Sequence, residues 1–359
     1  MNSSKPNISS ILSIWYSQNK RNLPWREVND PYLIWISEII LQQTRVVQGI
    51  SYYLKFIERF STVAQLAEAE EDEVLKYWQG LGYYSRARNI HKAARQITNE
   101  FGGIFPKIHS DVLKLAGVGE YTAAAICSFA YNQPFAVVDG NVFRVLSRLF
   151  GIETAIDSGN GKKEFTYLAQ ELLSKFEPGL HNQAIMEFGA LHCVPVSPDC
   201  NNCPFKFLCK ANELKLVSFL PIKSKKTKVT QRFFNYIFIE YQGNTYIQQR
   251  KAKDIWQNLY EFPLIESNRL FETSELLEDE EFNRFFGGIE KVEIIEKSNS
   301  VKHILTHRVI FAQFITITIS RESEKLKELI KVPINGLEKY AVSRLMELFL
   351  EKLGDFKLK

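Results

Sequence analysis

The chain has 359 residues, of which 45% are hydrophobic. This is enough to build two globular domains and excludes a disordered polypeptide. The formal net charge of +4 permits a nucleic-acid partner if the positive charges gather on one face. No apolar run is long enough for a bilayer, and residues 1–10 lack the pattern of a secretion signal. We therefore expect a cytoplasmic protein with no membrane partner.

Most of the first 220 residues follow a helical pattern. Residues 164–176 place their apolar side chains on one stripe with helical spacing, and residues 62–78 and 86–101 show a similar pattern. Proline and glycine separate these segments. The pattern predicts an all-α domain over residues 1–220.

A change of composition marks a second domain. Residues 221–230 contain four lysines and few apolar residues, which is typical of a solvated linker. Three segments after it are rich in Ile, Phe, Tyr and Thr and predict strands: 233–241, 245–250 and 308–320. Two others look helical: 274–286 and 337–353. We therefore expect a smaller α+β domain over residues 231–359.

A hairpin between two helices is predicted at about residues 111–130. The stretch 111–115 looks helical, Gly117-Val118-Gly119 breaks it, and a second helix follows. Two glycines permit positive φ angles and the close approach of another backbone. The N–H groups that begin the second helix can then bind a phosphate. A Gly-x-Gly pair alone is common in turns, but between two helices it indicates a helix-hairpin-helix that holds DNA without reading its sequence.

Four of the five cysteines lie within one short segment, residues 193–209: Cys193, Cys200, Cys203 and Cys209. Four clustered thiolates can bind zinc or an iron–sulfur cluster. Structural zinc usually shows two close cysteine pairs, whereas only Cys200 and Cys203 form such a pair here, so the spacing favours the larger cluster. The fifth, Cys127, lies in an apolar segment and is expected to be a small core residue.

Two carboxylates have strongly apolar sequence neighbours. Asp139 is either the N-cap of a helix over residues 142–150 or a functional group, and a cap would also orient it. Glu38 could have the raised pKa that a general acid needs. From periodicity alone, however, a solvent-facing helix position is the favoured interpretation of Glu38. A glycosidase needs such a pair, one residue to protonate the leaving group and one to stabilise a cation.

Several motifs together resemble the MutY family of adenine DNA glycosylases in the endonuclease III superfamily. They are Leu-Pro-Trp-Arg at 23–26, Ser-Glu-Ile-Ile-Leu-Gln-Gln-Thr at 37–44, residues 80–88, Asp-Gly-Asn-Val at 139–142, and the cysteine segment. The resemblance covers about residues 11–220 and continues more weakly beyond. It implies a monomeric repair hydrolase of the bacterial nucleoid that carries a [4Fe–4S] cluster on its cysteine loop. Its substrate would be adenine mispaired with 8-oxoguanine or guanine in double-stranded DNA.

The resemblance also implies catalytic roles. Glu38 would protonate N7 of the flipped adenine, and Asp139 would stabilise the cation at C1′ through its charge or a transient covalent bond, before water completes the hydrolysis. Tyr121 and Asn141 would hydrogen-bond this pair; the alternatives are packing within the second hairpin helix for Tyr121 and the cap of a turn for Asn141. Endonuclease III enzymes carry a Schiff-base lysine where this chain has Tyr121, so we expect a monofunctional glycosylase. Two alternatives remain: a bifunctional glycosylase and lyase for oxidised pyrimidines, and a non-catalytic iron–sulfur DNA-binding module.

Further positions match the family's base-binding residues. Trp25, Arg26 and Leu41 match the adenine pocket, while Gln43 and Tyr83 match side chains that intercalate to fill the gap left by a flipped base. For Trp25 and Tyr83, ordinary core packing is the alternative.

The C-terminal segment resembles the family's MutT-like (Nudix-like) domain, chiefly through residues 254–263, and would recognise 8-oxoguanine. It lacks the glutamate-rich signature that binds magnesium, so no nucleotide hydrolysis is expected. The family's Phe-Ser-His is replaced by Leu305-Thr306-His307, which keeps a hydroxyl group and the histidine. Thr306 and His307 are therefore the expected readers of 8-oxoguanine, the alternative being a polar corner before a strand.

Overall fold

The computed structural model describes residues 8–224, 229–287, 289 and 291–354. The chain forms two compact units: Met1–Glu68 with Asn89–Lys225, and Ala69–Arg88 with Lys226–Lys359. The sequence placed residues 69–88 in the helical domain, whereas the structure assigns them to the second unit. Of the proposed linker at 221–230, residues 225–228 lie outside the described residues.

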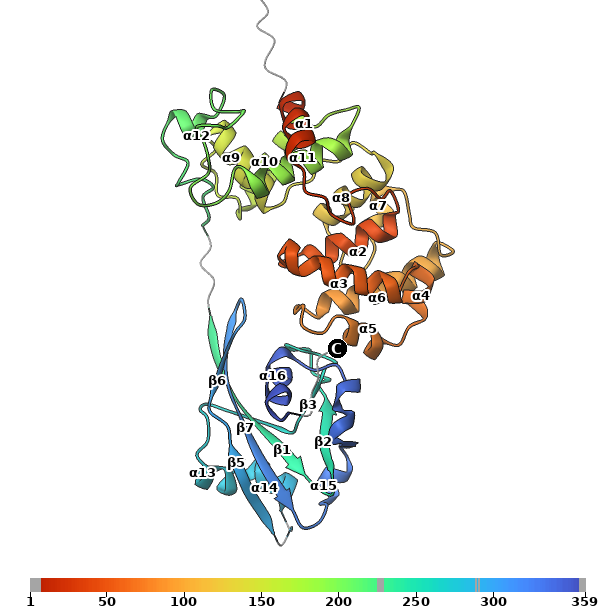
Figure 1. Ribbon diagram of the computed structural model, residues 1–359, viewed down its shortest axis with the longest axis vertical. Helices are drawn as coiled ribbons and strands as arrows, with labels where there is room; N and C mark the ends of the chain where they lie inside the picture. Colours follow the sequence, from red (N-terminus) through yellow and green to blue (C-terminus); the bar gives the residue numbers. More distant parts are fainter. Residues whose placement is uncertain (1–7, 225–228, 288, 290, 355–359) are drawn as a thin grey trace, which may run out of the picture. The chain divides into compact units, whose positions relative to one another are not determined.

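The first unit is helical (Figure 1). Its helices are α1 (Ile8–Asn19), α2 (Pro31–Leu41), α3 (Val46–Arg59), α4 (Val63–Glu68), most of α6 (Ser85–Glu100), α7 (His109–Val112), α8 (Glu120–Tyr131), α9 (Gly140–Phe150), α10 (Gly159–Leu172), α11 (Pro178–Leu191) and α12 (Lys210–Glu213). Helix α11 packs against α1, α8 and α9, and α2 packs against α3 and α8. Fully buried Leu12, Leu146 and Phe165 join α1, α9 and α10 in one apolar core.

Local signals explain where these helices begin. Asp30 caps α2 by accepting a hydrogen bond from the Tyr32 N–H at 2.8 Å, and Pro31 occupies the first turn, where no donor is missed. Ser158 caps α10 in the same way. The helical pattern predicted over residues 62–78 is two helices, α4 and α5 (Glu71–Tyr77), because the backbone at Glu70 is extended.

The second unit is built on two sheets. Its strands are β1 (Thr230–Glu240), β2 (Asn244–Gln249), β3 (Tyr260–Glu261), β4 (Leu264–Ser267), β5 (Val292–Lys297), β6 (Val301–Ile304), β7 (Arg308–Ile319) and β8 (Ile330–Pro333). The larger sheet has the order β4-β1-β7-β5, with β6 also paired to β7, and the smaller one the order β3-β2-β8. Strands β1 and β7 run parallel from Thr230 opposite Arg308 to Glu240 opposite Thr318. The strands predicted for β1, β2 and β7 are confirmed.

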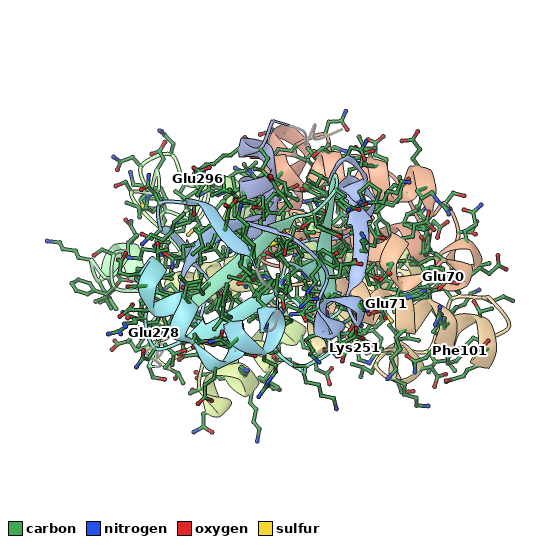
Figure 2. All side chains as sticks on the ribbon, turned by 90° about the horizontal axis from the view of Figure 1, so that it is seen from below. Glu70, Glu71, Phe101, Lys251, Glu278 and Glu296 are labelled. Carbon is green, nitrogen blue, oxygen red and sulfur yellow. The ribbon has the colours of Figure 1, made fainter. Side chains whose placement is uncertain are left out.

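The helices of this unit differ in detail from the prediction. They are α5, α13 (Thr273–Glu278), α14 (Glu280–Phe286), α15 (Glu324–Lys327), a 3₁₀ helix (Ile334–Lys339) and α16 (Arg344–Lys352). The single helix predicted over 274–286 is split at Asp279, which is extended and caps α14. The helix predicted from 337 begins only at Arg344, because Tyr340 is extended and Ser343 caps α16. Exposed Glu278 and Glu296 lie at the periphery of the unit (Figure 2).

Both units have apolar interiors. In the second, Phe238, Phe314 and Phe349 pack between the sheet and α16, with the rings of Phe314 and Phe349 stacked at 4.2 Å. Within the described residues, none of the helices combines the length and apolar character needed to traverse a bilayer.

Candidate active site

Glu38 projects from α2, a helix whose residues are almost all buried. It is only 7% exposed, so the solvent-facing position that periodicity favoured is wrong. Helix α2 packs against both α3 and α8, which covers it on more than one side and removes the amphipathic pattern. The Tyr121 hydroxyl, at the start of α8, donates a 2.7 Å hydrogen bond to Glu38 Oε2.

Asp139 is the N-cap of α9, as its sequence position allowed. One carboxylate oxygen accepts from the Val142 N–H at 2.8 Å and the other accepts from Asn141 Nδ2 at 2.7 Å. Arg144 in turn donates to Asn141 Oδ1 at 2.8 Å. The capping bonds therefore hold the carboxylate in one orientation.

One cavity of about 440 Å³ joins these groups. The predicted residues that line it are Trp25, Arg26, Glu38, Leu41, Gln43, Tyr121, Asp139 and Asn141. The volume falls in the range of small-molecule pockets. Four separate segments of the chain therefore meet at one site.

The two carboxyl groups are tuned differently. Burial, together with the negative charge of Asp139, raises the pKa of Glu38 to about 7, against the lowering effects of the Tyr121 hydrogen bond and of Arg26. Burial also raises the pKa of Asp139, but hydrogen bonds from Val142 and Asn141 and the charge of Arg144 oppose that rise. At neutral pH Glu38 can thus donate a proton, while the bonds to Asp139 favour its anion.

A third carboxylate was missed by the sequence analysis. Glu187 on α11 is 1% exposed and lines the same cavity. Its Oε2 accepts from Arg21 at 2.7 Å and from Arg26 at 2.9 Å. Burial by itself would raise the pKa of Glu187. The hydrogen bonds and charges of Arg21 and Arg26 lower it by more, so its pKa lies below the usual value. No local signal could have found it, because its partners lie more than 160 residues away in the chain.

The predicted helix-hairpin-helix is present as α7, a turn and α8. Gly117 has φ +75°, and a Cβ atom there would lie 2.6 Å from Asn89 Cβ. Position 117 thus requires a glycine both because of its positive φ angle and because a side chain there would clash with Asn89. Gly119 is the N-cap of α8 and faces open space, whereas the Val118 side chain is buried. The side of the turn near Gly119 is the one that another molecule can approach.

The four clustered cysteines line one small cavity of about 30 Å³, together with Arg148 of α9 and His192. Cys193, Cys203 and Cys209 also pack against the apolar core of the first unit. Burial raises the pKa of Cys203 to about 11, so a thiolate there needs a compensating positive charge. In the part of the chain that the structure describes, no three or more metal-binding side chains are spaced to hold a single metal ion. Cys127 is fully buried, as predicted for a core residue.

Arg144 and Arg148 on α9 contact the start of the cysteine loop. Arg144 Nε donates to the Cys193 carbonyl at 2.7 Å, while its Nη2 holds Asn141. Arg148 is 3% exposed and donates to the carbonyls of Val194 and Pro195 at 2.7 and 3.0 Å. One helix therefore carries Asp139 at its start and anchors the cysteine loop one and two turns later.

The remaining predicted residues lie in the second unit. Tyr83 does not line the Glu38 cavity; its hydroxyl is 2.5 Å from Thr306 Oγ1. Tyr83, Thr306 and His307 line a second cavity of about 700 Å³, together with Trp256 and His303. Tyr83 is 49% exposed, so ordinary core packing does not explain it.

Comparisons with known proteins agree with this arrangement. Residues 36–175 match the HhH-GPD superfamily of base excision DNA repair proteins, and residues 235–352 match the NUDIX domain family. The solved structure of a thermostable thymine-DNA glycosylase superposes with a TM-score of 0.54 at 30% identity, covering 57% of this chain and 95% of that one. Fold and site therefore define a helix-hairpin-helix DNA glycosylase joined to a Nudix-like domain.

Two relatives that align with most of the chain identify the family within this class of DNA glycosylases. The adenine DNA glycosylase of Buchnera aphidicola subsp. Schizaphis graminum is 39% identical over 256 residues, covering 71% of this chain and 74% of its own. That of Buchnera aphidicola subsp. Acyrthosiphon pisum is 33% identical over 321 residues, covering 89% of both. The chain belongs to the adenine DNA glycosylase family, which confirms the resemblance and the fold predicted from its motifs.

Proposed function

We propose that this protein removes adenine mispaired with 8-oxoguanine, or with guanine, from double-stranded DNA by hydrolysing the N-glycosidic bond. The observation that carries the proposal is a buried glutamate with a pKa of about 7 in the same cavity as a capped aspartate. Hydrolysis of this bond needs an acid for the leaving base and a negative charge beside the sugar cation. The membership in the adenine DNA glycosylase family supports adenine as the base.

In this mechanism Glu38 protonates N7 of the extruded adenine, so the base leaves as a neutral molecule. Asp139, held by Val142 and Asn141, stabilises the cation that develops at C1′. Water then adds to C1′ and loses a proton, which completes the hydrolysis. Tyr121 donates to Glu38 Oε2, which leaves the other oxygen to carry the proton. Trp25 and Leu41 line the cavity that receives the base, and Gln43 would intercalate from its edge.

The same geometry disfavours a lyase. Tyr121 occupies the position of the Schiff-base lysine, and its burial raises the pKa well above the usual range of a phenol. A neutral phenol forms no imine with C1′, so strands break only when alkali is added. Borohydride should therefore trap no covalent enzyme–DNA product.

The DNA backbone is bound at Gly117–Gly119, whose open side permits close approach. Thr306 and His307 read 8-oxoguanine, and Tyr83, which contacts Thr306, fills the gap left by the adenine. One chain carries every one of these groups, so we propose that it acts as a monomer, with the bacterial nucleoid as its place of action.

We also propose that Cys193, Cys200, Cys203 and Cys209 hold a [4Fe–4S] cluster. Two observations support it: all four line one cavity, and Cys193, Cys203 and Cys209 pack against the apolar core of the first unit. When bound, the cluster supplies four iron–thiolate bonds that tie the loop to the core. Iron and sulfide analysis of protein purified without oxygen tests this, and one zinc per chain would overturn it.

A gel assay tests the function. A duplex with adenine opposite 8-oxoguanine should be cleaved only after alkali, whereas thymine opposite guanine should stay intact. Thymine is the informative control because a thymine-DNA glycosylase shares this fold. Release of thymine, or strand breakage without alkali, would contradict the proposal.

A further inference from the structure

Thr306 and His307 occupy the tip of a tight β-hairpin in the second unit. Strand β6 ends at Ile304, β7 begins at Arg308, and the Leu305 N–H donates to the Arg308 carbonyl at 2.8 Å. Both tip residues are exposed. An exposed tip of this kind needs a partner outside the hairpin to define its position.

The loop between β2 and β3 is one such partner, besides Tyr83 and Thr230, and it contacts both strands of the hairpin. Asp254 in this loop accepts a hydrogen bond from the guanidinium of Arg308, the first residue after the tip. Two residues later Trp256 packs edge-to-face on His303 of β6, with ring centroids 5.8 Å apart. The loop therefore holds β7 through an ion pair and β6 through an aromatic contact.

Asp254 is the centre of a cluster of three arginines. Besides Arg308, it accepts from Arg232 Nη1 at 2.5 Å and from Arg250 Nη2 at 3.3 Å. Burial raises its pKa, but the hydrogen bonds from Arg308 and Arg232 outweigh this and lower the pKa to about 2. Asp254 is therefore charged at every pH at which the enzyme would work.

The three arginines do not depend on Asp254 equally. Arg232 also makes two hydrogen bonds of 2.6 Å with Glu266, and Arg250 makes two with Glu261 at 2.8 and 2.9 Å. For Arg308, by contrast, Asp254 is the carboxylate partner found among the described residues. Loss of the Asp254 charge would therefore act mainly on Arg308, at the base of the tip.

We propose that Asp254 is a positioning residue for 8-oxoguanine recognition, because it fixes the hairpin tip through Arg308. This inference rests on the proposed function, in which Thr306 and His307 read the base opposite adenine. It extends the reading site from the tip to the loop that holds it. Asp254 itself need not touch DNA.

The test compares single-turnover adenine release from two duplexes, one with 8-oxoguanine and one with guanine opposite adenine. Asp254→Asn should lower the preference for 8-oxoguanine by about tenfold, the usual effect of losing one charge-assisted hydrogen bond. Release opposite guanine should change little, since the two catalytic carboxylates lie in the first unit. Equal losses on both duplexes, or an unchanged preference, would overturn the inference.

Further variants separate positioning from general damage. Arg308→Gln should reproduce the loss, and it also serves if Asp254→Asn does not fold. The double variant Asp254→Asn/Thr306→Ala should lose no more of the preference for 8-oxoguanine over guanine than Thr306→Ala alone. Both substitutions act through the same contact, that of the hairpin tip with 8-oxoguanine. Additive losses would contradict this. Glu293→Gln is the matched control, since it breaks an exposed ion pair with Lys291 in the same unit.

A binding measurement keeps this inference distinct from the proposed function. If the wild-type enzyme releases no adenine from either duplex, the proposed function fails. Fluorescence anisotropy with 8-oxoguanine opposite an abasic site still reports on the tip, and Asp254→Asn should weaken that binding relative to guanine opposite an abasic site. An unchanged ratio would overturn the positioning role alone.

Discussion

The Glu38 cavity and the Thr306 hairpin tip differ in how their polar side chains are exposed to water. In the cavity, two carboxylates are withdrawn from water, and burial is the main cause of their raised pKa values. At the tip, Thr306 and His307 stay exposed, and Asp254 forms ion pairs with the adjacent Arg308 and with Arg232. In the first region burial sets the pKa of a carboxyl group, and in the second ion pairs support an exposed hairpin tip.

This difference shows which variants should change the chemical step and which should change recognition. A group whose reactivity depends on burial is sensitive to loss of its proton or its hydrogen bonds. A group that acts by position is sensitive to loss of its anchors. The two regions should therefore respond to different experiments.

The largest effect is expected at Glu38. Glu38→Gln removes the proton donor while keeping shape, so single-turnover adenine release should fall by about 10²–10⁴-fold, the range for general acid catalysis. DNA binding should persist. Glu58→Gln, an exposed position on α3, is the control and should be fully active. Full activity of Glu38→Gln would refute the acid assignment.

Burial of Glu38 should also be visible in stability. Its pKa is about 7 in the fold and near 4.5 when exposed, so the folded state binds this proton more tightly. The stabilisation is therefore present at low pH and is lost as pH rises through 7. Between pH 5.5 and 8.5, wild type should lose about 2 kcal/mol relative to Glu38→Gln. Denaturant unfolding at both pH values measures the difference, and parallel changes would show that Glu38 is not buried as described.

The dependence of the adenine-release rate on pH tests the role of Tyr121. Wild-type release should decline above about pH 7 as Glu38 loses its proton. Tyr121→Phe removes the hydrogen bond that lowers this pKa, so the decline should move to higher pH. A shift of one unit corresponds to about 1.4 kcal/mol. Rate measurements from pH 5.5 to 9 decide the point; a shift to lower pH would be inconsistent with this geometry.

The smallest effect is expected at the contact between Tyr83 and Thr306. Tyr83→Phe removes one exposed hydrogen bond and leaves the ring in place, so preference for 8-oxoguanine over guanine should fall only about three- to fivefold. Competition between the two duplexes measures it. A loss as large as that of Glu38→Gln would mean that Tyr83 takes part in the chemical step.

Much of this organisation could be predicted because it is encoded locally. The cap at Asp139, the glycines of the hairpin and the spacing of the four cysteines each depend on neighbouring residues. The strands β1, β2 and β7 were predicted because segments rich in Ile, Phe, Tyr and Thr suit a sheet.

Other features could not be predicted, because they depend on contacts between distant segments. Periodicity misjudged Glu38, since the packing of α3 and α8 against α2 buries it. Glu187 carried no local signal. Residues 69–88 belong to the second unit although they lie, in sequence, between two segments of the first unit. The breaks before α5 and α14 were also missed, because a single extended residue is enough to end a helical pattern.

The sequence by itself determined the fold class of each domain, the spacing of the four cysteines and, through its motifs, the pair of acids that the chemistry requires. Only the tertiary structure decided that Glu38 is buried with a pKa of about 7 and that Asp254 contacts Arg308 beside the hairpin tip. The reason is physical: a pKa depends on the water and charges around a group, and an anchor depends on which segments meet. Neither property belongs to a residue until the chain has folded around it.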